Sequence, residues 1–136
     1  MSASVSLVVP LARLFLSLIF IISGLGKIAG YAGVAQYMQA MGVPGALLPV
    51  VILTEIACGV ALLVGWQARI AAFLLAGFSL LSGIVFHLVP AGGLEGMAAQ
   101  AEITSFLKNV AIAGGLLMVT ATGAGRLSLD ARRGDQ

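Results

Sequence analysis

The run LLPVVILTEIACGVALLVGW, residues 47–66, decides how the rest of the chain is read. It is apolar over about the 20 residues that a helix needs to cross the hydrocarbon core of a bilayer, and its one charge is Glu55. An acidic side chain at the centre of a membrane helix costs about 2.5–3.5 kcal/mol on insertion scales. We therefore expect Glu55 to face other helices and to be protonated, paired or close to water.

The composition of the whole chain also indicates a lipid environment. The 136 residues are 60% hydrophobic and 9% charged, with a mean hydropathy of +1.12. A soluble domain carries about 25% charged residues, so this chain has too few charges to cover a surface in water. Its net charge is only +2, and the absence of a basic run interleaved with aromatics argues against a nucleic-acid partner.

Four segments are long and apolar enough to span a membrane, namely residues 7–28, 46–66, 70–89 and 103–121. They are apolar on every face, whereas barrel strands of about 10 residues alternate apolar and polar positions. The fold class is therefore predicted to be all-α, an integral membrane four-helix bundle with antiparallel, up-down topology. It forms a single domain over residues 1–136 that ends in a short charged tail, residues 122–136.

The connections between the predicted spans are short. The Gly-rich segment around Pro44 is expected to be an interfacial loop or a short surface helix. Residues 67–69 leave room only for a tight turn, and residues 90–102, PAGGLEGMAAQAE, are expected to form a loop. The N-terminal MSASVSLVV lacks a basic n-region, so we interpret it as retained rather than as a signal peptide.

The distribution of Lys and Arg predicts the orientation, because cytoplasmic loops carry the excess of basic residues. An even number of spans places both termini on the same side. The predicted side of the termini collects the arginines Arg13, Arg69, Arg126, Arg132 and Arg133. The opposite side has Lys27 and Lys108. We therefore expect the N-terminus and the C-terminus to be cytoplasmic.

The first span supplies two candidate partners for Glu55. Arg13 and Lys27 are 14 residues apart, which is about 21 Å along a helix and less than the core thickness of about 30 Å. Each of the two cations either reaches the interface by snorkelling or turns inward. We favour Arg13 as the partner, because a guanidinium can bind a carboxylate through two hydrogen bonds and stays charged when desolvated.

Three interpretations of Glu55 remain open at this point. The first is a structural ion pair that locks the first two spans together. The second is a site for a polar or quinone-like ligand, or a proton relay. The third is a neutral, hydrogen-bonded acid with no role beyond packing.

His87 closes the third span in FHLVP, near the non-cytoplasmic face. A lone histidine there is most simply an interfacial anchor, and its functional interpretation is a proton donor or ligand to a quinone head group. No metal site is predicted, because no Cys/His cluster exists to complete a coordination shell. Glu102, Lys108 and Asn109 join His87 and Lys27 at this mouth, with Glu102 available to pair with Lys108. They form a solvated rim or a small polar pocket.

The chain lacks the short motifs of complete enzyme sites. It has no P-loop, no dinucleotide-binding glycine pattern after a strand, no H-E-x-x-H and no G-x-S-x-G. Its one cysteine, Cys58, lies in an apolar run and is read as a small buried hydrophobe. The catalytic residues therefore stay unassigned, and Glu55, Arg13, Lys27 and His87 are the candidate intramembrane polar site.

Several stretches together resemble the DoxX family. ARLFLSLIFIISGLGKIAG (12–30) resembles its first helix, and TEIACGVALLVGWQARIAA (54–72) resembles its second signature. The third span ending in Phe86 and His87, and FLKNVAIAGGLLMV (106–119) followed by GAGRLSLD (123–130), complete the resemblance. The recurring polar positions of the family then fall on Arg13, Lys27, Glu55, Arg69 and His87.

The resemblance implies a small, multi-pass, four-helix protein of the bacterial inner membrane. Relatives named for a thiosulfate:quinone oxidoreductase subunit imply redox work beside the quinone pool, with quinone as the one cofactor to consider. The first hypothesis is an accessory subunit of a membrane-associated oxidoreductase, in which Glu55, Arg13 and His87 orient the site. The alternative is a non-catalytic scaffold whose loops and tail recruit a soluble partner. An oligomer is compatible with both.

Overall fold

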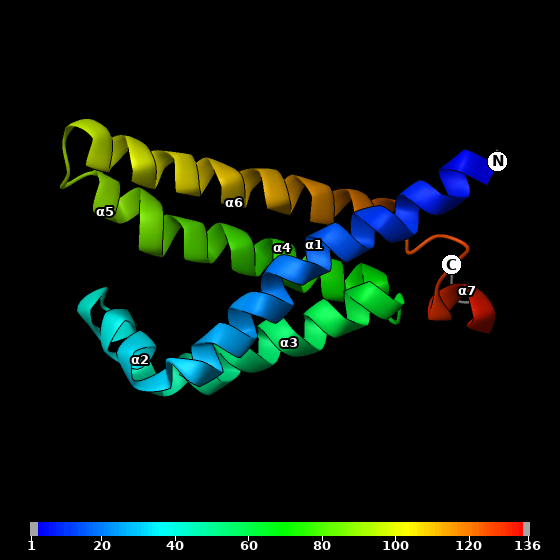
Figure 1. Cartoon of the computed structure of the whole chain (residues 1–136), viewed down its shortest axis with the longest axis horizontal. Helices are drawn as coiled ribbons and strands as arrows, with labels where there is room; N and C mark the ends of the chain where they lie inside the picture. Colours follow the sequence, from blue (N-terminus) through cyan, green and yellow to red (C-terminus); the bar gives the residue numbers. More distant parts are fainter. Residues whose placement is uncertain (1–2, 135–136) are drawn as a thin grey trace.

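The computed structural model of the chain describes residues 3–134, and within this range every regular element is a helix (Figure 1). Four helices are long and apolar enough to cross a membrane, which confirms the predicted fold class. The elements in order are α1 (Ala3–Ala29), α2 (Tyr31–Ala40), η1 (Gly45–Leu47), α3 (Leu48–Val64), α4 (Ala68–Gly83), the π-helix η2 (Ile84–Leu88), α5 (Val89–Ala91), α6 (Gly96–Thr122) and α7 (Leu129–Arg133).

Three connecting segments differ from a plain loop. The segment before Pro44 forms the surface helix α2, which was one of the two alternatives expected there. Helix α6 begins at Gly96, so the expectation of a loop as far as residue 102 is wrong. The 27 residues of α6 measure about 40 Å, so its polar first turns extend beyond a core of about 30 Å. The predicted tail contains α7, and residues 135 and 136 lie outside the described range.

The long helices pack as two pairs. Helix α1 lies along α3 and α4 lies along α6, and α3 joins the two pairs through α4, whereas α1 and α6 make few contacts. The start of α1 and the helix α7 lie at one end of the molecule, here called the terminal end (Figure 1). Towards the opposite end, the far end, the two pairs diverge. The cytoplasmic orientation of the terminal end stays a prediction.

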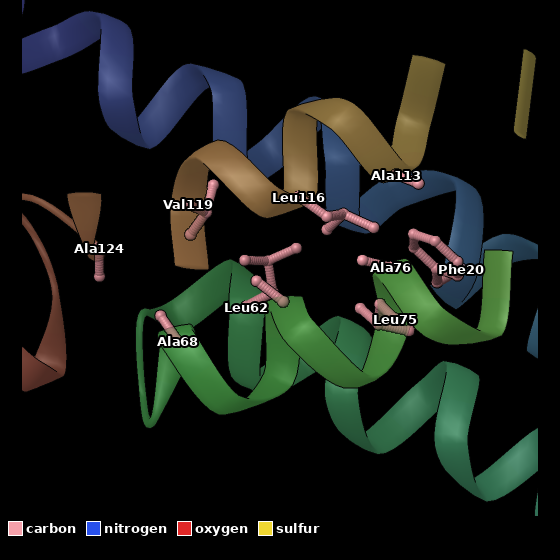
Figure 2. Close-up of a cluster of buried hydrophobic side chains, with 10 residues drawn as sticks. Phe20, Leu62, Ala68, Leu75, Ala76, Ala113, Leu116, Val119 and Ala124 are labelled. Carbon is pink, nitrogen blue, oxygen red and sulfur yellow. The ribbon is translucent and has the colours of Figure 1, made fainter. Parts of the chain in front are cut away.

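The core is built largely from small side chains. Figure 2 shows Phe20 of α1, Leu75 and Ala76 of α4 and Leu116 of α6 pointing toward one another. Buried alanines line both sides of the α4–α6 contact, and Cys58 is half-buried against this cluster. Helices attract one another in lipid mainly through van der Waals packing, so small residues that permit close approach stabilise such contacts.

Gly83 tests how tightly α4 and α6 approach each other. A Cβ at Gly83 would lie 2.9 Å from Cβ of Asn109, whereas a Cβ at Gly77 on the same helix meets nothing within 4 Å. We expect Gly83→Ala to destabilise the bundle by about 1–3 kcal/mol through overpacking. Gly77→Ala should be neutral or stabilise by up to about 1 kcal/mol. Unfolding in mixed detergent micelles measures both, and equal effects would contradict close packing at Gly83.

Candidate polar site within the membrane

The centre of the candidate site is an ion pair between α1 and α3. Glu55 is buried, with 3% of the whole residue exposed. Lys27 Nζ lies between its two carboxylate oxygens, 2.9 Å from Oε2 and 3.0 Å from Oε1. The Lys27 side chain keeps 24% of its surface exposed, against 4% for Glu55. The pair therefore reaches from the middle of the bundle toward its surface.

The preference for Arg13 as the partner of Glu55 is wrong, and the antiparallel register of α1 and α3 explains why. The C-terminal half of α1 lies beside the N-terminal half of α3, which places Lys27 next to Glu55. Gly24 permits this close approach, since a Cβ there would lie 2.6 Å from Ile56 Cγ1. Arg13 is about 21 Å away along α1, which is beyond the reach of its side chain.

Ser23 completes the cluster, which we call the Ser23–Lys27–Glu55 site. Its hydroxyl donates a 3.1 Å hydrogen bond to Glu55 Oε1 and accepts one from Lys27 Nζ. Ser23 and Lys27 are four residues apart and so share one face of α1. Sequence reasoning missed Ser23, although its i,i+4 spacing to a lysine in a membrane helix is the signal that identifies it.

A small cavity adjoins this site in the centre of the bundle. It encloses about 100 Å³ and is lined from all four long helices by Ile19, Phe20, Ser23, Glu55, Phe78, Ser79, Asn109 and Ile112. A buried water occupies about 30 Å³ of liquid volume, and a cavity of about 150 Å³ holds benzene. The cavity therefore has room for a few waters or for the polar edge of a ring whose remainder lies outside.

The rim residues predicted at the far end separate into different places. His87 Nδ1 lies 2.7 Å from Glu102 Oε2, and both side chains are partly exposed. The expected partner of Glu102, Lys108, instead lies on an exposed face of α6. Asn109 lines the Glu55 cavity and so belongs to the central site. His87 does not line that cavity, and its pairing with Glu102 ties the π-helix η2 to α6.

Arg13 belongs to a second cluster, at the terminal end. It is buried, and its Nη2 donates to the backbone oxygen of Leu127. The buried carboxylate of Asp130 accepts hydrogen bonds from the backbone nitrogens of Gln67 at 2.7 Å and Ala68 at 2.9 Å, where α4 begins. Asp130 thus caps α4 from the tail. We call this cluster, Arg13 with Asp130 and its partners, the tail latch, and sequence reasoning missed it.

Arg69 acts at the same end as a cap for α6. Its Nη1 donates to the backbone oxygens of Thr120 at 2.9 Å and Ala121 at 2.7 Å, in the last turn of the helix. Those carbonyls have no partner within the helix, and a cation there also suits the helix dipole. The polar positions that the sequence singled out therefore serve the two ends of the bundle as well as its centre.

The chain is similar to known inner membrane proteins over most of its length. The DoxX family model matches residues 8–88, from the second turn of α1 to the end of η2. "Inner membrane protein YqjF" of Escherichia coli (strain K12) is 45% identical over 122 residues, covering 90% of this chain and 88% of that protein. "Inner membrane protein YphA" of the same organism is 34% identical over 124 residues, covering 90% and 87%. No solved structure matches the chain. The chain therefore belongs to the DoxX family and is a multi-pass inner membrane protein.

Proposed function

We propose that this protein is an accessory membrane subunit of an oxidoreductase linked to the quinone pool, and that it supplies a polar site for the quinone ring. The observation that carries the proposal is the buried Lys27–Glu55 pair beside a cavity that four helices line. Ionisable residues at membrane depth are costly, and they commonly mark ligand or proton pathways. The resemblance to relatives named for a quinone-linked oxidoreductase agrees with this interpretation.

The residues at the site fit a quinone carbonyl, which is a hydrogen-bond acceptor. Asn109, which lines the cavity, supplies an amide donor, and the cavity of about 100 Å³ accommodates one edge of the ring. A bound quinone would supply two-electron redox chemistry, with two protons taken up on its reduction to quinol. The charge of Lys27, held beside the cavity by Glu55, would stabilise negative charge that develops on a ring oxygen there, and Glu55 would accept or return a proton.

The remainder of the reaction is assigned to partners. The whole sequence contains one cysteine and one histidine, so we propose that the electrons come from a redox centre on another subunit. Lys27 is partly exposed, so we propose that it connects the buried carboxylate with the membrane surface at the far end. The apolar side chains of Ile19, Phe20 and Ile112 keep bulk water from the cavity on its other sides.

Quinone retention by the purified protein tests this proposal. We expect wild-type protein extracted in mild detergent to carry quinone, identified by mass spectrometry of its bound lipids. Glu55→Gln should retain about tenfold less, because a hydrogen bond to a charged group contributes about 1.5–3 kcal/mol. Thr54→Val is the matched control, since that hydroxyl bonds to its own helix at Val50 O. Wild-type protein without quinone, or equal retention by Glu55→Gln at normal abundance, would refute the proposal.

The alternative proposal, a scaffold for a soluble partner, is favoured by one observation. The tail latch holds α7 in place, and α7 presents Arg132 and Arg133 as exposed side chains at the terminal end. Deleting the tail would also remove Asp130, so reversing these two charges is the cleaner test. The scaffold proposal expects a stoichiometric acidic protein to co-purify with wild type and to be lost from the Arg132→Glu/Arg133→Glu variant. Unchanged co-purification would contradict it.

A further inference from the structure

An apolar groove continues from the central cavity toward the terminal end. It has a volume of about 430 Å³ and is lined by α1 side chains within residues 8–16 and by α6 side chains within residues 115–123. The central cavity takes its α1 and α6 lining from the next turns, at Ile19 and Ile112. Leu16 to Ile19 and Ile112 to Gly115 are steps of three residues, so cavity and groove share one face of each helix.

The groove and the cavity together form a continuous seam between α1 and α6, and this seam faces the bilayer. Each of these helices packs mainly on another partner, α1 on α3 and α6 on α4, and the two make few contacts with each other. Side chains along the seam, such as Phe15, Ile19 and Met118, are exposed. The groove and the mouth of the cavity are therefore open to lipid-soluble molecules without any passage through water.

The groove part of the seam is apolar, and the cavity at its inner end is polar. That polar end lies deep in the membrane. Glu55 is ten residues after Gly45 and nine before Val64, the limits of its span. A phospholipid that filled the groove would keep its charged head group at the membrane surface and leave the polar cavity unmatched. A second protein helix would bring apolar side chains to the cavity mouth. An uncharged polar ring on a long apolar tail matches both parts.

We infer that the α1–α6 seam seats the isoprenoid tail of a membrane quinone while the ring docks at the Ser23–Lys27–Glu55 site. This inference rests on the proposed function and adds the route of entry and the position of the tail. The polarity of the lining fixes the direction of the seat, because Ser23, Glu55 and Asn109 line the cavity that takes the ring, whereas only apolar side chains and Thr122 line the groove that takes the tail. The tail then runs from the cavity toward the terminal end.

Tryptophan substitutions in the groove test the inference. Ala12 lines the groove and is exposed, whereas its neighbour Leu11 is exposed but does not line it. On α6, Met118 lines the groove and its neighbour Leu117 does not. The probes are a benzoquinone with an isoprenoid tail and the same ring without the tail, bound at equilibrium to protein in lipid nanodiscs. Thermal unfolding of each variant establishes that it is folded.

We expect wild-type protein to bind the tailed quinone more tightly than the ring alone. Ala12→Trp and Met118→Trp should each weaken binding of the tailed quinone by about tenfold or more. This loss corresponds to removing two or more methylene groups of the tail from the groove. Binding of the bare ring should be unchanged in both variants. Leu11→Trp and Leu117→Trp should leave the affinities for both probes unchanged.

Each of the other outcomes would overturn either the position of the tail or the proposed quinone site. If wild-type protein binds both probes equally, the tail does not lie in the groove, while the proposed quinone site stands. If wild-type protein binds neither probe, the proposed function itself fails. Equal losses in groove and control variants would contradict the assigned seam. If the groove variants change only the oligomeric state, a second copy of the chain occupies the groove and the inference is wrong.

Discussion

Replacing Lys27 by Met should destabilise the bundle by about 3 kcal/mol, the lower end of the cost of removing one partner from a buried ion pair. The lower end applies because the Lys27 side chain is 24% exposed. Methionine keeps the apolar volume of the lysine stem and removes the charge, which leaves the Glu55 carboxylate at membrane depth with Ser23 as its hydrogen-bond donor. The free energy of unfolding in mixed detergent micelles measures the effect.

Replacing the other partner, Glu55, should destabilise the bundle less than replacing Lys27. This difference between the two variants is the sharper test. Glu55→Gln leaves Lys27 without its carboxylate, but Lys27 lies in the last turn of α1 and can extend to the interface. We expect a loss of about 1 kcal/mol, the usual scale of a hydrogen-bond change. The double variant Lys27→Met/Glu55→Leu should recover most of the stability, because an apolar pair often replaces a buried ion pair at no cost. Equal single effects without recovery would contradict this account.

Removal of the Asp130 carboxylate should have an effect of similar size at the terminal end. Asp130→Ala leaves the buried backbone N–H of Ala68 without its acceptor and removes the acceptor of Gln67 N–H as well. Capping bonds contribute about 0.5–2 kcal/mol, and a buried unsatisfied donor costs about 1–3 kcal/mol. We therefore expect a destabilisation of about 2–4 kcal/mol, measured by the same unfolding assay.

Two companion variants define what the tail latch contributes. Arg132→Ala, an exposed change on the same short helix, should alter stability by less than about 0.5 kcal/mol. The stability of Asp130→Asn should lie between those of Asp130→Ala and Arg132→Ala. Its one carboxamide oxygen can accept only part of the hydrogen bonds that two carboxylate oxygens accept. If Asp130→Ala is as stable as Arg132→Ala, the tail rests on the bundle without capping α4.

The membrane architecture was predictable because it depends on local composition. Each span is a run of mostly apolar residues, and neither its length nor its helical state depends on distant contacts. The burial of Glu55 followed from the cost of placing a carboxylate against acyl chains, and the structure confirms that burial. The start of α6 was misjudged because its first turns are polar and carry no hydropathy signal, although they continue the same helix.

The pairing of the polar side chains was not predictable on the same grounds. Arg13 and Lys27 both belong to the first span, and charge chemistry favoured arginine over lysine as the partner of a carboxylate. Position decides which cation pairs with Glu55, because Gly24 and the antiparallel register bring Lys27 beside it. Glu102 likewise pairs with His87 rather than Lys108, because η2 packs against α6 and brings the histidine within hydrogen-bond distance of Glu102.

The sequence by itself determined that this protein lies in a bilayer, crosses it as four helices and buries the acid Glu55. These properties follow from transfer free energies that each segment pays independently. The tertiary structure alone decided that Lys27 is the partner of that acid, that Asp130 of the tail caps α4 and that the seam between α1 and α6 stays open. Such contacts join residues far apart in the chain, so they depend on helix register and crossing, which no single segment encodes.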